Sequence, residues 1–173
     1  FKGIAHYNIA RALEDNNIEY KDINTRATYF NSILWSSQIE LEDSYMFTYY
    51  SLFDNSPPSF TKKFPKNHDM LMPFIDNKKI QQLIILSNGH YIMTNENNEL
   101  IFWNLKLGQK GFDKNASPYI WSYVIEKTDQ TEILLDETNE KMNALKIQEV
   151  RSFRNNRKYS EEFNNFMERL KGI

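Results

Sequence analysis

The sequence contains no cysteine, which excludes disulfide bonds, thiolate metal ligands and a cysteine nucleophile. Glycine is also scarce, and the five glycines never gather into the loop that cradles a phosphate group. No apolar run approaches the roughly 20 residues that a membrane-spanning helix needs. Basic charge is not in excess, because 21 Lys and Arg face 23 Asp and Glu for a net charge of −2. Dedicated nucleic-acid-binding proteins usually carry a basic excess, so we expect no nucleic-acid partner.

The composition that remains is that of a folded protein. Apolar residues make up 40% of the chain and charged residues 25%, which is enough to bury a core and too apolar for intrinsic disorder. A length of 173 residues fits one domain of ordinary size better than two small ones. We therefore expect a single water-soluble domain over residues 1–173.

Hydrophobic periodicity predicts helices at both ends of the chain and in its middle. Residues 4–18 carry apolar side chains at helical spacing, and Asn16 and Asn17 then provide a stop. Residues 67–87 are predicted to form two short helices, because Pro73 interrupts the pattern and Asn67 can cap the first piece. Near the C-terminus, 139–154 has helical spacing and 160–170 has a stronger pattern, with Ser160 as a candidate N-cap.

Strict alternation predicts three strand pairs between these helices. Residues 33–41 and 45–51 flank a short acidic turn, and both of their faces carry apolar side chains, so we expect this hairpin to be central in its sheet. Residues 90–94 and 100–107 flank an Asn-rich turn, and 119–126 pairs with 131–135. The sum is an α+β fold, in which helices pack on an antiparallel sheet of about five or six strands.

Catalytic motifs are missing. The three histidines, His6, His68 and His90, have none of the spacings typical of metal sites, and G-x-S-x-G does not occur. Loop and helix-end acids such as Asp54 and Asp69 are better interpreted as capping residues than as a catalytic pair. We therefore predict no catalytic site, metal site or cofactor in this chain.

Two segments carry a family resemblance: Tyr29 to Asp54 (YFNSILWSSQIELEDSYMFTYYSLFD) and Leu86 to Gln109 (LSNGHYIMTNENNELIFWNLKLGQ). The chain resembles, over roughly residues 1–127, the C-terminal region of the predicted membrane-bound, metal-dependent hydrolases of the YdjM-like type. Those proteins carry Asn-x-x-x-Trp, then a Tyr-Tyr-Ser-Leu-x-Asp-like stretch, a Gly-Tyr-Tyr-like strand and Asp-Leu-Arg-Phe-Gly. The matching positions that we take as candidate site residues are Trp35, Tyr50, Asp54, Tyr91, Asn104 and Lys106. The last two depart from the family, which has Asp and Arg there, so we expect a weaker amide–ammonium contact in place of an ion pair.

The resemblance implies an extramembrane accessory domain without a catalytic site of its own. Family members carry an N-terminal bundle of membrane helices with the residues of a divalent-metal site, and that region is not part of this chain. The helix at 4–18, which lacks a capping residue, is then expected to continue from the last membrane helix. The chain would be membrane-associated through that region, on a side that the sequence leaves open, and the region would be its partner. The alternative is a freestanding module whose aromatic sheet faces line a pocket for an unknown small molecule or protein.

Overall fold

A computed structural model describes residues 1–28, 32–96, 99–109, 119–127, 145–151 and 166–172. The chain folds into two compact units. Unit 1 comprises residues 1–65, 109–118 and 155–173, and unit 2 comprises residues 66–108 and 119–154. The prediction of a single domain over 1–173 stays a prediction.

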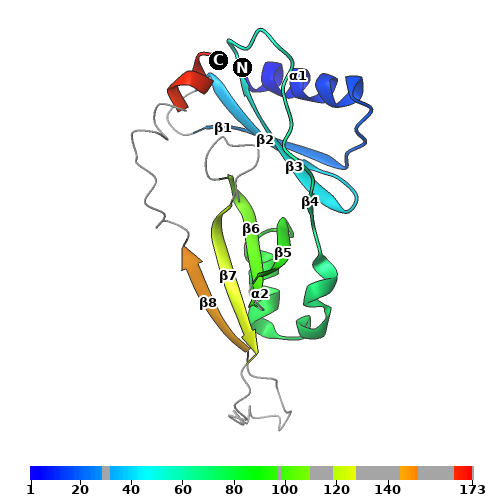
Figure 1. Cartoon of the computed structure of the whole chain (residues 1–173), viewed down its shortest axis with the longest axis vertical. Coiled ribbons are helices and arrows are strands. Elements are labelled where there is room, and N and C mark those ends of the chain that lie inside the picture. The colour runs from blue at the N-terminus through cyan, green and yellow to red at the C-terminus, as the bar shows by residue number, and fades with distance from the viewer. Residues whose placement is uncertain (29–31, 97–98, 110–118, 128–144, 152–165, 173) are drawn as a thin grey trace. The chain divides into compact units, whose positions relative to one another are not determined.

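Unit 1 is a helix on a four-stranded antiparallel sheet (Figure 1). The sheet order follows the chain order, so β2 and β3 are the central strands, as the sequence predicts. The C-terminal residues 166–170 add a short helix to this unit. The elements are α1 (Lys2–Asp15), β1 (Asp22–Ala27), β2 (Leu34–Glu40), β3 (Ser44–Ser51) and the two-residue β4 (Phe64–Pro65).

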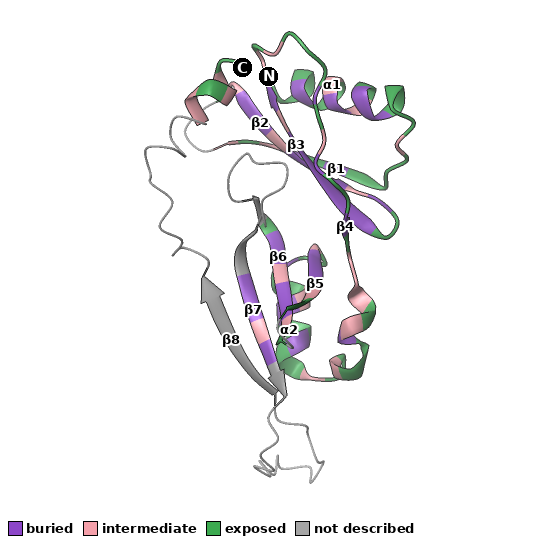
Figure 2. Ribbon diagram, viewed as in Figure 1, coloured by how far each residue is buried: buried purple, intermediate pink, exposed green. Residues whose placement is uncertain are grey.

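The core of unit 1 lies between α1 and one face of the sheet. Ile9 and Leu13 are fully buried because apolar side chains three to four positions apart share one side of a helix. They pack with Ile39 of β2 and Met46 of β3. Figure 2 shows the result: α1 is buried along one side and exposed along the other.

The end of α1 agrees with the prediction from its asparagines. The helix ends at Asp15, three residues earlier than expected, and Asn17 follows with a φ of 53°. Asn tolerates this left-handed conformation better than most residues. The sequence pattern does not predict strand β1, because its residues are mostly polar and give no clear alternation of apolar and polar side chains.

Unit 2 combines two short helices with a second four-stranded sheet, in the order β5-β6-β7-β8. Two short helices form, as predicted, but Pro73 lies inside the first, a 3₁₀ helix, and the break before the α-helix falls at residues 75–77. Asn88 and Gly89 form the turn into the sheet with φ values of 54° and 78°. The elements are η1 (His68–Phe74), α2 (Lys78–Leu86), β5 (Tyr91–Glu96), β6 (Glu99–Gln109), β7 (Tyr119–Lys127) and β8 (Leu145–Arg151).

The core of unit 2 is formed by α2 and the sheet. Ile80 of α2 and Leu71 of η1 are buried with Met93 of β5 and Phe102 of β6. Asn67, expected to cap η1, occupies the N-cap position without a capping bond, and its amide donates to the Met93 carbonyl oxygen instead. That bond connects the start of η1 to the sheet.

The α+β class is confirmed, with two corrections. The strands form two sheets of four rather than one sheet of about five or six. Residues 145–151 form β8, antiparallel to β7, whereas the sequence predicted a helix over 139–154. Pairing with β7 satisfies the backbone of this segment in a way that its weak helical spacing did not reveal. The expected strand at 131–135 lies outside the described residues, and the helix at 160–170 is described only over 166–170.

Candidate functional site

The six candidate residues divide equally between the two units. Trp35 of β2 lies opposite Tyr50 of β3 in unit 1, and Asp54 follows three positions after that strand. Tyr91 of β5 lies opposite Asn104 of β6 in unit 2, and Lys106 is two residues further along β6. The structure therefore forms two groups of three, each centred on a pair of residues that face each other across neighbouring strands.

Trp35 and Tyr50 connect the sheet of unit 1 to α1. Both are buried, at 7% and 8% exposure, and both belong to the core beneath the helix. The Trp35 indole N–H donates to the Ser32 carbonyl oxygen at 3.0 Å. The Tyr50 hydroxyl accepts from the Asn8 amide of α1 at 3.0 Å. Each polar group is thus satisfied inside the protein, as buried Trp and Tyr require.

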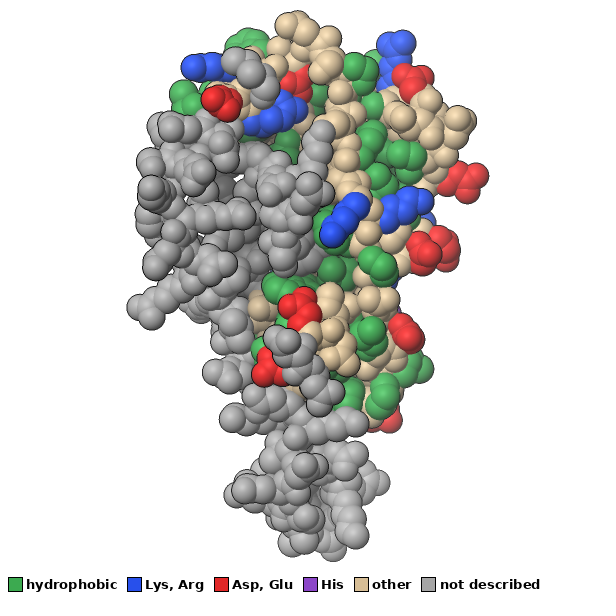
Figure 3. All heavy atoms as spheres, viewed as in Figure 1, with side chains coloured by type: hydrophobic (Ala, Val, Ile, Leu, Met, Phe, Trp, Pro, Cys, Tyr) green, Lys and Arg blue, Asp and Glu red, His purple; other side chains and the backbone are tan. Residues whose placement is uncertain are grey.

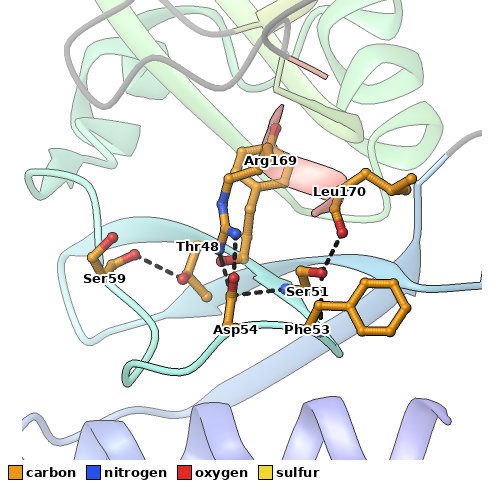
Figure 4. A network of polar contacts seen from close by, with 8 residues as sticks. Thr48, Ser51, Phe53, Asp54, Ser59, Arg169 and Leu170 are labelled. Carbon is orange, nitrogen blue, oxygen red and sulfur yellow. Dashed lines mark hydrogen bonds and ion pairs between the residues drawn. The ribbon is translucent and has the colours of Figure 1, made fainter. Parts of the chain in front are cut away.

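Asp54 binds an arginine that lies 115 positions away in the sequence (Figure 4). Its two carboxylate oxygens accept from Nη1 and Nη2 of Arg169, each at 2.6 Å, and Nη2 also donates to the Tyr49 carbonyl oxygen at 2.6 Å. The Ser51 backbone N–H donates to Asp54 Oδ2 at 2.9 Å. Two parallel bonds of this kind form the strongest geometry available to a carboxylate and a guanidinium.

This ion pair is shielded from water. The Asp54 side chain is 6% exposed and that of Arg169 is 22% exposed. A pair that is buried in this way is screened little by salt, and the loss of one partner leaves a charge without compensation. The Asp54 carboxylate is therefore fully used within the chain.

Tyr91 lies in a stack of aromatic rings in unit 2. Its ring centroid is 3.9 Å from that of His68 and 4.6 Å from that of Phe102, with interplanar angles of 16° and 15°. Tyr123 meets Phe102 edge to face, at 6.2 Å. Burial raises the pKa of the Tyr91 phenol above its ordinary value.

His68 is held above Tyr91 by a hydrogen bond as well as by stacking. Its Nε2 lies 2.8 Å from the Tyr91 carbonyl oxygen. A carbonyl oxygen only accepts, so Nε2 carries the hydrogen in this contact. The histidine therefore fixes the start of η1 against β5.

Asn104 and Lys106 also bond within unit 2. The Asn104 side-chain oxygen accepts the backbone N–H of Lys106 at 2.9 Å, and Asn104 is only 2% exposed. The Lys106 ammonium donates to the Leu86 carbonyl oxygen, at the last residue of α2, at 3.4 Å. A cation near the C-terminus of a helix is favourable because the helix dipole is negative there.

A chain of polar side chains that the sequence did not reveal lies in unit 1. The Ser37 hydroxyl donates to Thr25 Oγ1 at 2.8 Å, and His6 Nδ1 lies 3.2 Å from the same oxygen. A hydroxyl beside an imidazole is the first requirement of nucleophilic catalysis. Here, however, Ser37 and Thr25 are 0% and 2% exposed, so a substrate cannot reach either hydroxyl.

Charged side chains of both signs lie on the surface of the described residues (Figure 3). Basic and acidic side chains are interspersed on the face in view (Figure 3). Within the described ranges, His, Asp and Glu never gather in a group of three or more that could hold a metal ion. Among the helices described, none has the length and apolar character needed to cross a membrane.

Comparisons with known proteins give no match. No family model, curated protein or solved structure matches this chain. The chemistry must therefore be inferred from the contacts themselves. Among the candidate residues, these contacts position backbone segments and hold helices against sheets.

Proposed function

We propose that this chain is the extramembrane accessory domain of a membrane-bound, metal-dependent hydrolase of the YdjM-like type. It acts as a folded platform next to the bilayer, and the metal and the catalytic groups belong to the N-terminal membrane region of that protein. The observation that carries the proposal is that the motif side chains bond to other residues of this chain. Asp54, the one acid among them, is bound by Arg169 through both oxygens, and Trp35 and Tyr50 are bonded beneath α1.

The outward face of α1 supports the proposed partner. Ile4 and Tyr7 lie three positions apart on one side of the helix. Both are large hydrophobic residues, and yet they are 52% and 63% exposed. The opposite side of the same turns is buried against the sheet through Ala5 and Ile9. A helix that is apolar on both sides gains stability when a second surface covers it. The protein's own membrane region would provide that surface.

Cell fractionation of the complete gene product tests the membrane assignment. We expect the product in the membrane pellet after an alkaline wash, and we expect protease treatment to release a stable fragment that contains this chain. Recovery in the soluble fraction would contradict the proposal. It would favour the alternative, a freestanding module that binds a small molecule or a protein partner at its aromatic sheet faces.

Calorimetry tests the accessory role. Titration of zinc or manganese into this chain should give no stoichiometric heat, because the proposal assigns the metal to the membrane region. A tight one-to-one heat would overturn it. Asp54→Asn serves as the matched variant, since a metal site built on this carboxylate would lose its affinity in that variant.

A further inference from the structure

The Asp54 corner of unit 1 is held in shape by three local hydrogen bonds. We define it as residues 49–54, at the end of β3 and in the turn that follows. Asp54 N–H donates to the Ser51 carbonyl oxygen, Ser51 N–H donates to Asp54 Oδ2, and Phe53 N–H donates to Ser51 Oγ. All three bonds join residues that are two or three positions apart. The corner is therefore shaped by its own short segment and not by what binds to it.

The corner presents groups suited to an arginine at the end of a helix. The Asp54 carboxylate and the Tyr49 carbonyl oxygen surround one guanidinium, and both oxygens of the carboxylate are used. The Ser51 hydroxyl donates to the Leu170 carbonyl oxygen at 2.7 Å. This carbonyl is at the end of the 166–170 helix, where the last carbonyls have no partner inside the helix. Figure 4 shows both contacts.

The bound segment requires glycine at position 172. Gly172 has a φ of 80°, and a Cβ at this position would lie 2.5 Å from the Phe53 carbonyl oxygen. An L-residue with a side chain would therefore be both strained and too close. The corner thus recognises three features of one segment: the guanidinium of Arg169, the carbonyl of Leu170 and the bare backbone of Gly172.

We propose that the Asp54 corner is a docking site for an arginine-bearing helix end followed by glycine. The chain's own residues 166–172 fill it and form a releasable latch. The same segment of a second copy is the partner that fits when the latch is open. This inference is independent of the proposed membrane role, because every contact in it lies within unit 1.

Peptide binding in trans tests the site on the full chain. Arg169→Ala removes the guanidinium, and release of the segment also opens Asp54 to water. We titrate the isotope-labelled variant with a synthetic peptide of residues 160–173 to millimolar concentration, because short helices are marginal in water. We expect saturable NMR shifts at the Ser51, Phe53 and Asp54 amides. The unaltered chain, whose corner is filled, should shift at least about tenfold less.

Two matched peptides test the chemistry. A peptide with Arg169→Lys keeps the charge but loses the fork of two bonds, so we expect about tenfold weaker binding. A peptide with Gly172→Ala should fail for steric reasons. Equal binding by all three peptides, or equal shifts in the unaltered and Arg169→Ala chains, overturns the proposal.

Hydrogen exchange gives a second measurement that does not need Arg169→Ala to fold. In the full chain with Gly172→Ala, the amides of residues 166–172 should exchange faster than in the unaltered chain, while those of β3 keep their protection. The control is Gly3→Ala, where a new Cβ meets nothing within 4 Å. Exchange over 166–172 that is equally fast in all three chains would mean that the latch is not closed, and would refute the inference.

Discussion

The titration of Tyr49, in β3 of unit 1, makes the stability of the folded protein depend on pH. Burial raises the pKa of its phenol to about 12, and this outweighs a hydrogen bond with Ser36 and the charge of Arg26, both of which lower it. The folded state therefore holds the phenolic hydrogen more tightly than the unfolded state does. The consequence is a stability that falls in alkali.

We predict that unfolding experiments between pH 9 and pH 12 will show this loss. The folded pKa of Tyr49 is raised above its ordinary value of 10.0, so its contribution is complete below pH 10 and is lost as pH rises toward 12. The expected loss is about 2 kcal/mol by pH 12. Urea unfolding at each pH measures it.

The control is Tyr49→Phe, which lacks the titrating group. Other tyrosines and the lysines also titrate in alkali, so the difference between the two chains isolates Tyr49. If the two stability curves stay parallel from pH 9 to pH 12, the assignment to Tyr49 is wrong.

Among the helices, α2 begins with a side-chain cap. The Asn77 side chain accepts the backbone N–H of Lys79 at 2.9 Å, at the start of Lys78–Leu86. A short helix has few internal hydrogen bonds, so one bond at its start is a large share of the total. Ile80 and Leu83 then fix the helix against the core of unit 2.

We expect Asn77→Ala to destabilise the protein by about 1 kcal/mol, because the first turn loses its acceptor. Chemical denaturation followed by circular dichroism measures the change. Asn77→Asp keeps an acceptor oxygen and should retain the stability. Equal losses in the two variants would indicate that the side-chain bond contributes nothing.

The latch is an element of a different kind, because its contacts are distant in sequence. Its described helical residues, 166–170, are held by Asp54 and Ser51. Its position in the fold therefore depends on these tertiary contacts.

In the molecule as a whole, the buried apolar side chains form two separate cores, one in each unit. The cluster under α1 and the cluster around α2 share no residue. Each unit is also assembled from segments that are not continuous in the chain. Substitutions in one core should therefore be felt first within that core.

Single-tryptophan chains can measure this division. One chain keeps Trp35 in unit 1 and the other keeps Trp103 in unit 2, with phenylalanine at the other two tryptophan positions. We expect Ile9→Ala to lower the midpoint that Trp35 reports more than the one that Trp103 reports, and Met93→Ala to do the reverse. Both side chains are 0% exposed, and each truncation should cost about 2–5 kcal/mol.

Urea titrations followed by tryptophan fluorescence provide the measurement. Midpoints that shift together for both substitutions would show that the two cores unfold as one cooperative system. Such a result would contradict the prediction.

Features that depend on near neighbours in the chain could be predicted from the amino acids alone. Apolar spacing predicted α1, and alternation predicted the β2–β3 and β5–β6 hairpins. These features follow from backbone preferences and side-chain period within a few residues. The motif positions were also visible, although their contacts were not.

The contacts between distant segments could not be predicted in this way. Residues 145–151 became a strand because β7 offers them hydrogen-bond partners, and the strands separated into two sheets. Arg169 binds Asp54, which lies 115 positions away in the sequence, and no local pattern predicts such a pair. Pairings of this kind are selected by burial, by compensation of charge and by the cost of loop closure, which are properties of the complete fold.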